Sequence, residues 1–205
     1  MRRAPALVTG VVLGSALALS GCAAFQEPPE PIRLTAPPET FTEPPATTEP
    51  APEFTIVDSM FSQMMIPHHE QALEMAALVP ERTDAPEVLA LAEEIEAAQA
   101  PEIEQMRGWL EEWGLEADID LEEHEDHLGM EGMLTDEELA ALADSSGPEF
   151  DRLWLEGMIR HHEGAVVMAE TELASGIHEP SRQLAEEIIR TQESEITRMR
   201  AMLGE

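Results

Sequence analysis

The chain has 205 residues, a length that allows one modest domain with appended segments. It contains 43 Asp and Glu against 11 Lys and Arg, without a single lysine, and its formal net charge is −32 at pH 7. Binding of nucleic acid needs a basic surface, so this composition argues against a nucleic-acid partner, whereas so acidic a surface concentrates cations. With one cysteine, the chain can form neither an internal disulfide nor a multi-thiolate metal site.

The N-terminal segment has the pattern of a lipoprotein signal peptide, which we place at residues 1–21. Arg2 and Arg3 precede an apolar run at residues 4–19 that is too short to span a bilayer comfortably. The run leads into the tetrapeptide Leu-Ser-Gly-Cys, which predicts lipidation of Cys22. The alternative is an ordinary secretory signal with an incidental cysteine. The favoured interpretation predicts an exported protein that is anchored to the outer face of the cell membrane.

Residues 22–53 are predicted to form a tether. Nine prolines lie between positions 26 and 53, mixed with threonine and glutamate and almost nothing apolar. Such a composition cannot bury a core and favours a semi-rigid, polyproline-like spacer. The folded part of the chain is therefore expected at residues 54–205.

An internal repeat with an offset of 93 residues organises this folded part. Residues 58–110 align without a gap with residues 151–203, and 20 of the 53 positions are identical. The first copy contains MIPHHEQALEMA and the second MIRHHEGAVVMA, so each copy carries two adjacent histidines. The repeat predicts one helical-hairpin unit used twice, and any site must be explained by what the two copies share.

Apolar residues at three- and four-residue steps predict the helices of this unit. Pro67 predicts that the first helix starts or bends just before its histidines. A capping box at Thr135–Glu138 opens a short helix through position 143, inside a connector at residues 114–147. No strand pattern is present. Two such hairpins bury their apolar faces by packing together, which predicts an all-α four-helix bundle with approximate two-fold symmetry. The long helices are expected at residues 58–78, 86–113, 151–173 and 180–203.

Several polar residues fall on the inward faces of these predicted helices, in both copies. Buried polar groups are unfavourable unless they find partners, so their repetition indicates partners built into the architecture. One interpretation is a structural hydrogen-bond network that fixes the register of the bundle. The other is a metal site with supporting residues around it. The candidate ligands are His68, His69, His161 and His162, and the candidate supporting residues are Asp58, Asp151, Gln99, Gln192, Glu102 and Glu195.

Methionines that flank the histidine pairs narrow the choice of metal. Imidazoles with thioethers and no thiolate suit copper, which accepts histidine when oxidised and methionine when reduced. Packing of the core is the alternative role for these side chains. The flanking methionines are Met65, Met75, Met158 and Met168.

The connector holds a second group of candidate ligands. Its histidines and methionines recur every three residues in an acidic stretch that has no core to fill. We interpret the group as a flexible second site for copper or silver, or as a lid over the bundle; a chance cluster is the alternative. Its members are His124, His127, Met130 and Met133.

Enzymatic interpretations find little support in the sequence. The chain has no Glu-x-x-His motif of a di-iron bundle, no HExxH zinc motif and no glycine-rich phosphate loop. We therefore predict no catalytic residue and no organic cofactor, and an oxidase ranks behind the two non-enzymatic hypotheses.

The paired M-I-x-H-H-x-x-A-x-x-M-A motifs, each followed by L-A-x-x-I-x-x-x-Q-x-x-E-I-x-x-M, resemble the domain-of-unknown-function family 305. The resemblance covers about residues 57–203. It implies an exported, ferritin-like four-helix bundle in which the two histidine pairs are the signature residues, and some relatives are linked to copper binding and metal resistance. Pro67 departs from the variable polar residue that is usual at its position.

Together, the residues and the resemblance predict a membrane-anchored, extracytoplasmic protein that binds a transition metal. Copper is the favoured metal, and the predicted role is to buffer it or to deliver it to a metal-transfer protein. The rival hypothesis is a scaffold or interaction module whose inward His, Glu and Gln network is structural.

Overall fold

The computed structural model describes residues 53–117 and 132–205. The predicted signal peptide, Cys22, His124, His127 and Met130 lie outside the described residues, as does nearly all of the predicted tether. The described residues form helices and no strand, which confirms the all-α class. Among them, no helix combines the length and the apolarity that a membrane-spanning segment needs.

The four long helices are α1 (Ile56–Arg82), α2 (Pro86–Trp113), α4 (Pro148–Ser175) and α5 (Glu179–Leu203), and the short helix is α3 (Asp136–Asp144). The bounds of α2 agree with the prediction, and the other long helices are longer than expected by one to six residues. The predicted capping box opens α3: the Thr135 hydroxyl accepts from the Glu138 amide, and the Glu138 carboxylate accepts from the Thr135 amide.

Helix α1 does not start at Pro67, contrary to one of the two predicted outcomes. It begins at Ile56 and continues through this proline. Met65 and Ile66 before the proline and His68 after it are all buried, so tertiary packing holds the helix together across the missing hydrogen bond.

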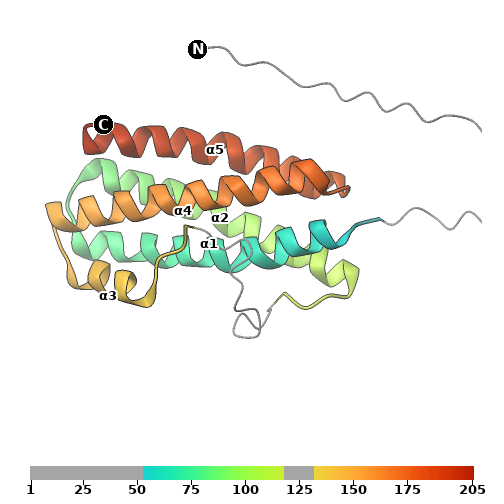
Figure 1. Ribbon diagram of the computed structural model, residues 1–205. Helices are drawn as coiled ribbons and strands as arrows, with labels where there is room; N and C mark the ends of the chain where they lie inside the picture. Colours follow the sequence, from blue (N-terminus) through green and yellow to red (C-terminus); the bar gives the residue numbers. More distant parts are fainter. Residues whose placement is uncertain (1–52, 118–131) are drawn as a thin grey trace, which may run out of the picture. The chain divides into compact units, whose positions relative to one another are not determined.

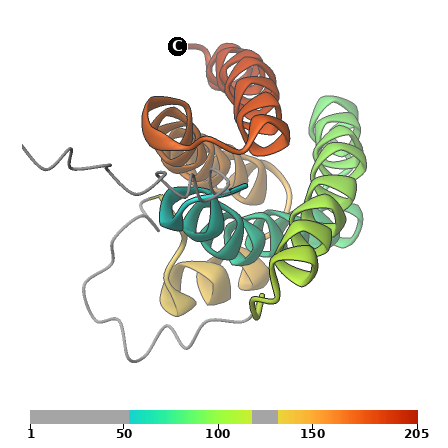
Figure 2. The same cartoon turned by 90° about the vertical axis from the view of Figure 1, so that its right-hand side faces the viewer.

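The long helices form two antiparallel hairpins, α1 with α2 and α4 with α5 (Figure 1). The hairpins meet through α1 and α4, so that α2 and α5 lie beside the central pair, and α3 contacts both α1 and α4 (Figure 2). Helices α2 and α5 do not pack closely on each other. The arrangement leaves the bundle with one tightly packed central seam and one looser side.

Two apolar cores fill the bundle, and a polar layer separates them. One core combines the C-terminal half of α1 and the N-terminal half of α2 with α3, the N-terminal half of α4 and the C-terminal part of α5. The other core combines the opposite halves of the long helices. Between them lie the fully or almost fully buried side chains of His68, His69, Gln99, His161, His162 and Gln192.

Candidate metal centre

The histidine layer, which we define as His68, His69, His161 and His162, is built around the meeting point of the two repeats. His68 and His161 occupy equivalent repeat positions on α1 and α4, and their rings pack against each other with centroids 3.8 Å apart and planes inclined by 39°. Both side chains are fully buried. Burial lowers the pKa of His161 well below its ordinary value, and the neighbouring His68 adds to this effect. The ring of His161 is therefore neutral at neutral pH, the form that binds metals.

The other two histidines each pair with a glutamate of the same hairpin. His69 Nε2 lies 2.8 Å from Glu102 Oε2, and His162 Nε2 lies 2.7 Å from Glu195 Oε2. Burial lowers the pKa of His162, although the Glu195 carboxylate opposes that shift. A neutral imidazole that donates its Nε2–H to a carboxylate leaves Nδ1 unprotonated. This is the arrangement in which metal-binding histidines are commonly held by a carboxylate behind them.

Several polar atoms in and beside the histidine layer are buried without any hydrogen-bond partner. They include Nδ1 of His69 and of His162, both ring nitrogens of His161, the Gln99 amide group and Oε1 of Gln192. Each such atom costs roughly 1–3 kcal/mol when nothing satisfies it. Unprotonated nitrogens without partners fit a soft or borderline metal ion such as copper. Among the residues described, however, no three His, Asp or Glu side chains are already arranged as a closed metal site.

The flanking methionines lie in the two apolar cores, on either side of the layer. Met65 and Met168 belong to one core, and Met75 and Met158 belong to the other. Three of the four are fully buried and Met168 is 7% exposed. The structure thus places them in the cores on either side of the layer, where their side chains fill apolar space.

Asp58 and Asp151 lie at the first turns of α1 and α4, away from the layer. The Asp58 carboxylate accepts hydrogen bonds from the backbone amides of Ile177 and His178 in the α4–α5 loop and from the Thr55 amide. Burial alone would raise the pKa of Asp58, but hydrogen bonds from the Thr55 hydroxyl and from the His178 and Thr55 amides lower it to about 2. Asp58 thus ties the start of α1 to the second hairpin, and none of these bonds reaches the histidine layer.

Sequence reasoning missed Glu172, a fully buried residue near the end of α4 that contacts Asp58. Burial and the negative charge of the neighbouring Asp58 raise the pKa of Glu172 to about 8. The space is tight, because a Cβ atom on Gly176 would lie 2.3 Å from Glu172 Oε1. The internal repeat contains the signal that could have found Glu172, because its equivalent in the first copy is Val79.

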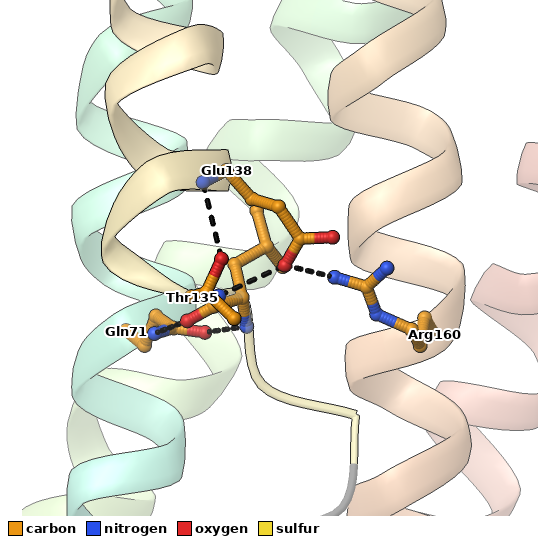
Figure 3. Close-up of polar contacts among 5 residues, drawn as sticks. Gln71, Thr135, Glu138 and Arg160 are labelled. Atoms are coloured by element: carbon orange, nitrogen blue, oxygen red, sulfur yellow. Dashed lines mark hydrogen bonds and ion pairs between the residues drawn. The ribbon is translucent and has the colours of Figure 1, made fainter.

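The end of the connector is fixed across the α1–α4 seam (Figure 3). The Gln71 side chain donates to the Leu134 carbonyl over 3.0 Å and accepts from the Leu134 amide over 2.7 Å. Arg160 of α4 binds Glu138 over 2.8 Å. Gly132, at φ 91°, lies so close to α4 that a Cβ atom would be 2.3 Å from the Arg160 carbonyl oxygen. Met133, which lies between Gly132 and Leu134 in the sequence, is half-buried.

The model of the family described as a domain of unknown function, DUF305, matches residues 58–203. Among curated proteins, none matches the chain.

Solved structures agree with this match. A DUF305 protein of Streptomyces coelicolor, described as secreted, is 35% identical, with a TM-score of 0.67 over 72% of this chain and 91% of its own. A DUF305 fragment from Deinococcus radiodurans is also 35% identical, with a TM-score of 0.66 over 75% of this chain and 99% of its own. CopM in its Cu(I)-bound form is 31% identical, with a TM-score of 0.59 over 71% of this chain and 94% of its own. The chain therefore belongs to the DUF305 family.

Proposed function

We propose that this protein is an exported copper-binding protein and that its histidine layer holds the metal. The observation that carries the proposal is the set of buried, unpartnered ring nitrogens on His69, His161 and His162. The similarity to CopM, whose solved forms include Cu(I)-, Cu(II)- and Ag-bound ones, supports copper as the metal. The relative from Streptomyces coelicolor, which is described as secreted, supports export.

The residues in and around the histidine layer would have different roles in metal binding. The imidazole nitrogens of the four histidines would supply the ligands. Glu102 and Glu195 would orient His69 and His162 by accepting their Nε2–H groups, which also makes the rings better donors. The buried thioethers of Met65, Met75, Met158 and Met168 are available above and below the layer to favour Cu(I).

Location and purpose extend the same proposal. A lipid on Cys22 would anchor the protein outside the cell membrane, and the proline-rich tether would hold the bundle away from it. We propose buffering of copper, or its delivery to a metal-transfer protein, as the role of such an anchored site. His124, His127, Met130 and Met133 would form a weaker second site on the connector.

A structural scaffold is the second candidate function, and one observation favours it. Each hairpin contains a complete His–Glu pair, His69 with Glu102 and His162 with Glu195, which would stabilise the bundle without any metal. A scaffold, however, gains nothing from the unpartnered atoms of His161, because a buried polar atom without a partner lowers stability.

Replacement of all four histidines of the layer by alanine tests the proposal. Titration with copper by calorimetry should show loss of the tighter binding phase, a weakening of at least about a hundredfold. His178→Asn is the matched control, because His178 lies outside the layer and asparagine preserves its role as the N-cap of α5. Circular dichroism checks that the four-alanine variant folds. If it folds and binds copper like the parent, the histidines are structural and the scaffold hypothesis replaces this one.

A further inference from the structure

Copper has to cross the wall of the bundle to reach the histidine layer, because all four imidazoles are fully buried. The two apolar cores close the layer toward both ends of the bundle. Within each hairpin the helices pack closely, α1 on α2 and α4 on α5. Two sides remain as routes: the α1–α4 seam and the side between α2 and α5.

The α1–α4 seam is closed by packing and by the end of the connector. Its helices pack closely, and Gln71 holds the Leu134 backbone over it with two buried hydrogen bonds (Figure 3). Gly132 presses against the Arg160 carbonyl, and Leu134 itself is 7% exposed. An ion that approached from this side would have to break a buried polar contact and displace an apolar plug.

The side between α2 and α5 is different, because charged side chains lead from solvent to the histidines there. The Glu102 side chain is 14% exposed and that of Glu195 is 12% exposed, while their histidine partners are fully buried. Each of these two glutamate side chains therefore reaches solvent and contacts a buried imidazole. Gln99 of α2 and Gln192 of α5, which are buried in the polar layer, also present amide atoms without partners. A passage lined by carboxylates and amides attracts cations, whereas the apolar cores exclude them.

At the rim of this side, an ion pair joins α2 and α5 at one end of the polar layer, whereas the residues at the equivalent positions toward the other end cannot form it. Arg198 of α5 binds Glu94 of α2 over 2.6 Å, one turn beyond Glu195. The repeat places Gln105 and Glu187 at the equivalent positions, and glutamine cannot form the same ion pair. Both members of the bridge are substantially exposed, with 38% and 57% of their side chains accessible, so the bridge can open at small cost.

We propose that copper reaches the histidine layer between α2 and α5, that Glu102 and Glu195 bind the incoming cation first, and that the Glu94–Arg198 bridge slows its passage. This inference rests on the proposed function. A bridge that slows passage changes the rates of binding and release by the same factor, because the bridge is closed both before copper enters and after copper is bound. Its removal therefore changes the barrier between the two states and not the affinity. A carboxylate that captures the cation mainly changes the rate of binding, since it raises the local concentration of the ion.

Removal of the bridge is the first test. The variant Arg198→Gln places the glutamine of position 105 at the equivalent position of the second repeat. The matched control is Arg152→Gln, which also removes one positive charge and one ion pair with an exposed glutamate, but on α4. Stopped-flow mixing of the full-length chain with Cu(II), followed by tryptophan quenching, should show binding and release both about two- to fivefold faster for Arg198→Gln. The dissociation constant should not change. Equal rates for Arg198→Gln and Arg152→Gln would overturn the role of the bridge.

Neutralisation of the two carboxylates is the second test. The double variant Glu102→Gln with Glu195→Gln keeps an oxygen that accepts from each histidine but removes the charge. Its association rate should fall roughly tenfold. The control is Glu93→Gln with Glu186→Gln, an exposed pair at equivalent repeat positions that removes the same total charge. If both double variants slow binding equally, only the overall charge attracts copper and the proposed route is wrong.

A third variant tests the opposite route. Gln71→Ala opens the connector side and should leave both rates unchanged; faster binding in this variant alone would place the route at the α1–α4 seam. Failure of the route is distinguishable from failure of the proposed function. In the first case the parent binds copper and the four-alanine variant does not, whereas in the second both behave alike.

Discussion

The two halves of the molecule agree at the histidine layer and diverge at the ends of their helices. His68, His69, Gln99 and Glu102 recur as identical residues in the second half, and the two His–Glu distances differ by only 0.1 Å. At the helix ends, by contrast, Val79 of the first half corresponds to Glu172 of the second. His68 and His161 occupy equivalent repeat positions and contact each other, so a change in one copy alters the surroundings of the other. Residues at the ends contact different loops and are free to differ.

The Val79/Glu172 difference gives the largest expected effect on stability. Glu172 keeps its proton in the folded protein up to a pKa of about 8, whereas an unfolded chain releases it near the ordinary value of 4.5. The unfolded state therefore binds fewer protons between these values, and the free energy of unfolding falls as pH rises through this range. Asp58 acts in the opposite sense: its contribution, present above its ordinary pKa of 3.8, is lost as pH falls toward about 2.

Glu172→Val, which copies the first repeat, should remove the alkaline part of this dependence. Urea denaturation should show that, as the pH rises from about 5 to about 9, the free energy of unfolding of the variant increases relative to that of the parent by on the order of a few kcal/mol. Glu170→Val, an exposed substitution on the same helix, should follow the parent. Parallel pH profiles for Glu172→Val and the parent would show that Glu172 is not protonated in the folded state.

The connector creates the second difference between the halves. Gln71 corresponds to Gly164, and each contacts the connector in its own way: Gln71 binds Leu134, and Gly164 leaves room for Gly132. Gln71→Ala leaves the buried amide and carbonyl groups of Leu134 without their hydrogen-bond partner and should lower the free energy of unfolding by about 2 kcal/mol. Chemical denaturation measures this loss. The control Gln63→Ala removes an exposed bond to the Glu116 carbonyl and should cost clearly less; equal losses would mean that Gln71 does not hold the connector.

The agreement at the histidine layer predicts equal effects in the two halves. Glu102→Ala and Glu195→Ala should each weaken copper binding by about tenfold, because each removes the acceptor that orients one histidine. Copper titration of the two single variants makes the comparison. A loss confined to one of them would show that the metal is held by one half alone, and unchanged affinity in both would assign the His–Glu pairs to stability.

The sequence predicted the features that depend on periodicity and repetition. The four long helices follow from apolar residues at regular steps, and the burial of His68 and His161 follows from their place on those faces. Contacts between distant segments were not predictable in the same way. The α4–α5 loop binds Asp58 through backbone amides, which carry no sequence signature. The helical face of Asp58 alone therefore predicts a place beside the histidines.

Two other departures have the same origin. Pro67 is incompatible with a helix interior by local rules, yet buried residues on both sides keep α1 continuous. Gln71 has no feature that marks it as a contact, because its partner is the backbone of a segment 63 residues away. In both cases tertiary packing, which a local pattern does not contain, decides the outcome.

The smallest expected effect concerns a pair of ion pairs that the two halves share. Arg107 of α2 binds Glu70 of α1, and Arg200 of α5 binds Glu163 of α4, at equivalent repeat positions. All four side chains are between 44% and 50% exposed, so water and salt screen both interactions. Arg107→Ala and Arg200→Ala should each lower the free energy of unfolding by less than about 1 kcal/mol, and high salt should reduce the loss further. Denaturation at low and high salt checks both statements. Losses well above this value would mean that surface charges, and not the apolar cores, hold the two helices of each hairpin together. Unequal losses for the two variants would show that the two halves differ on their surfaces as they do at their helix ends.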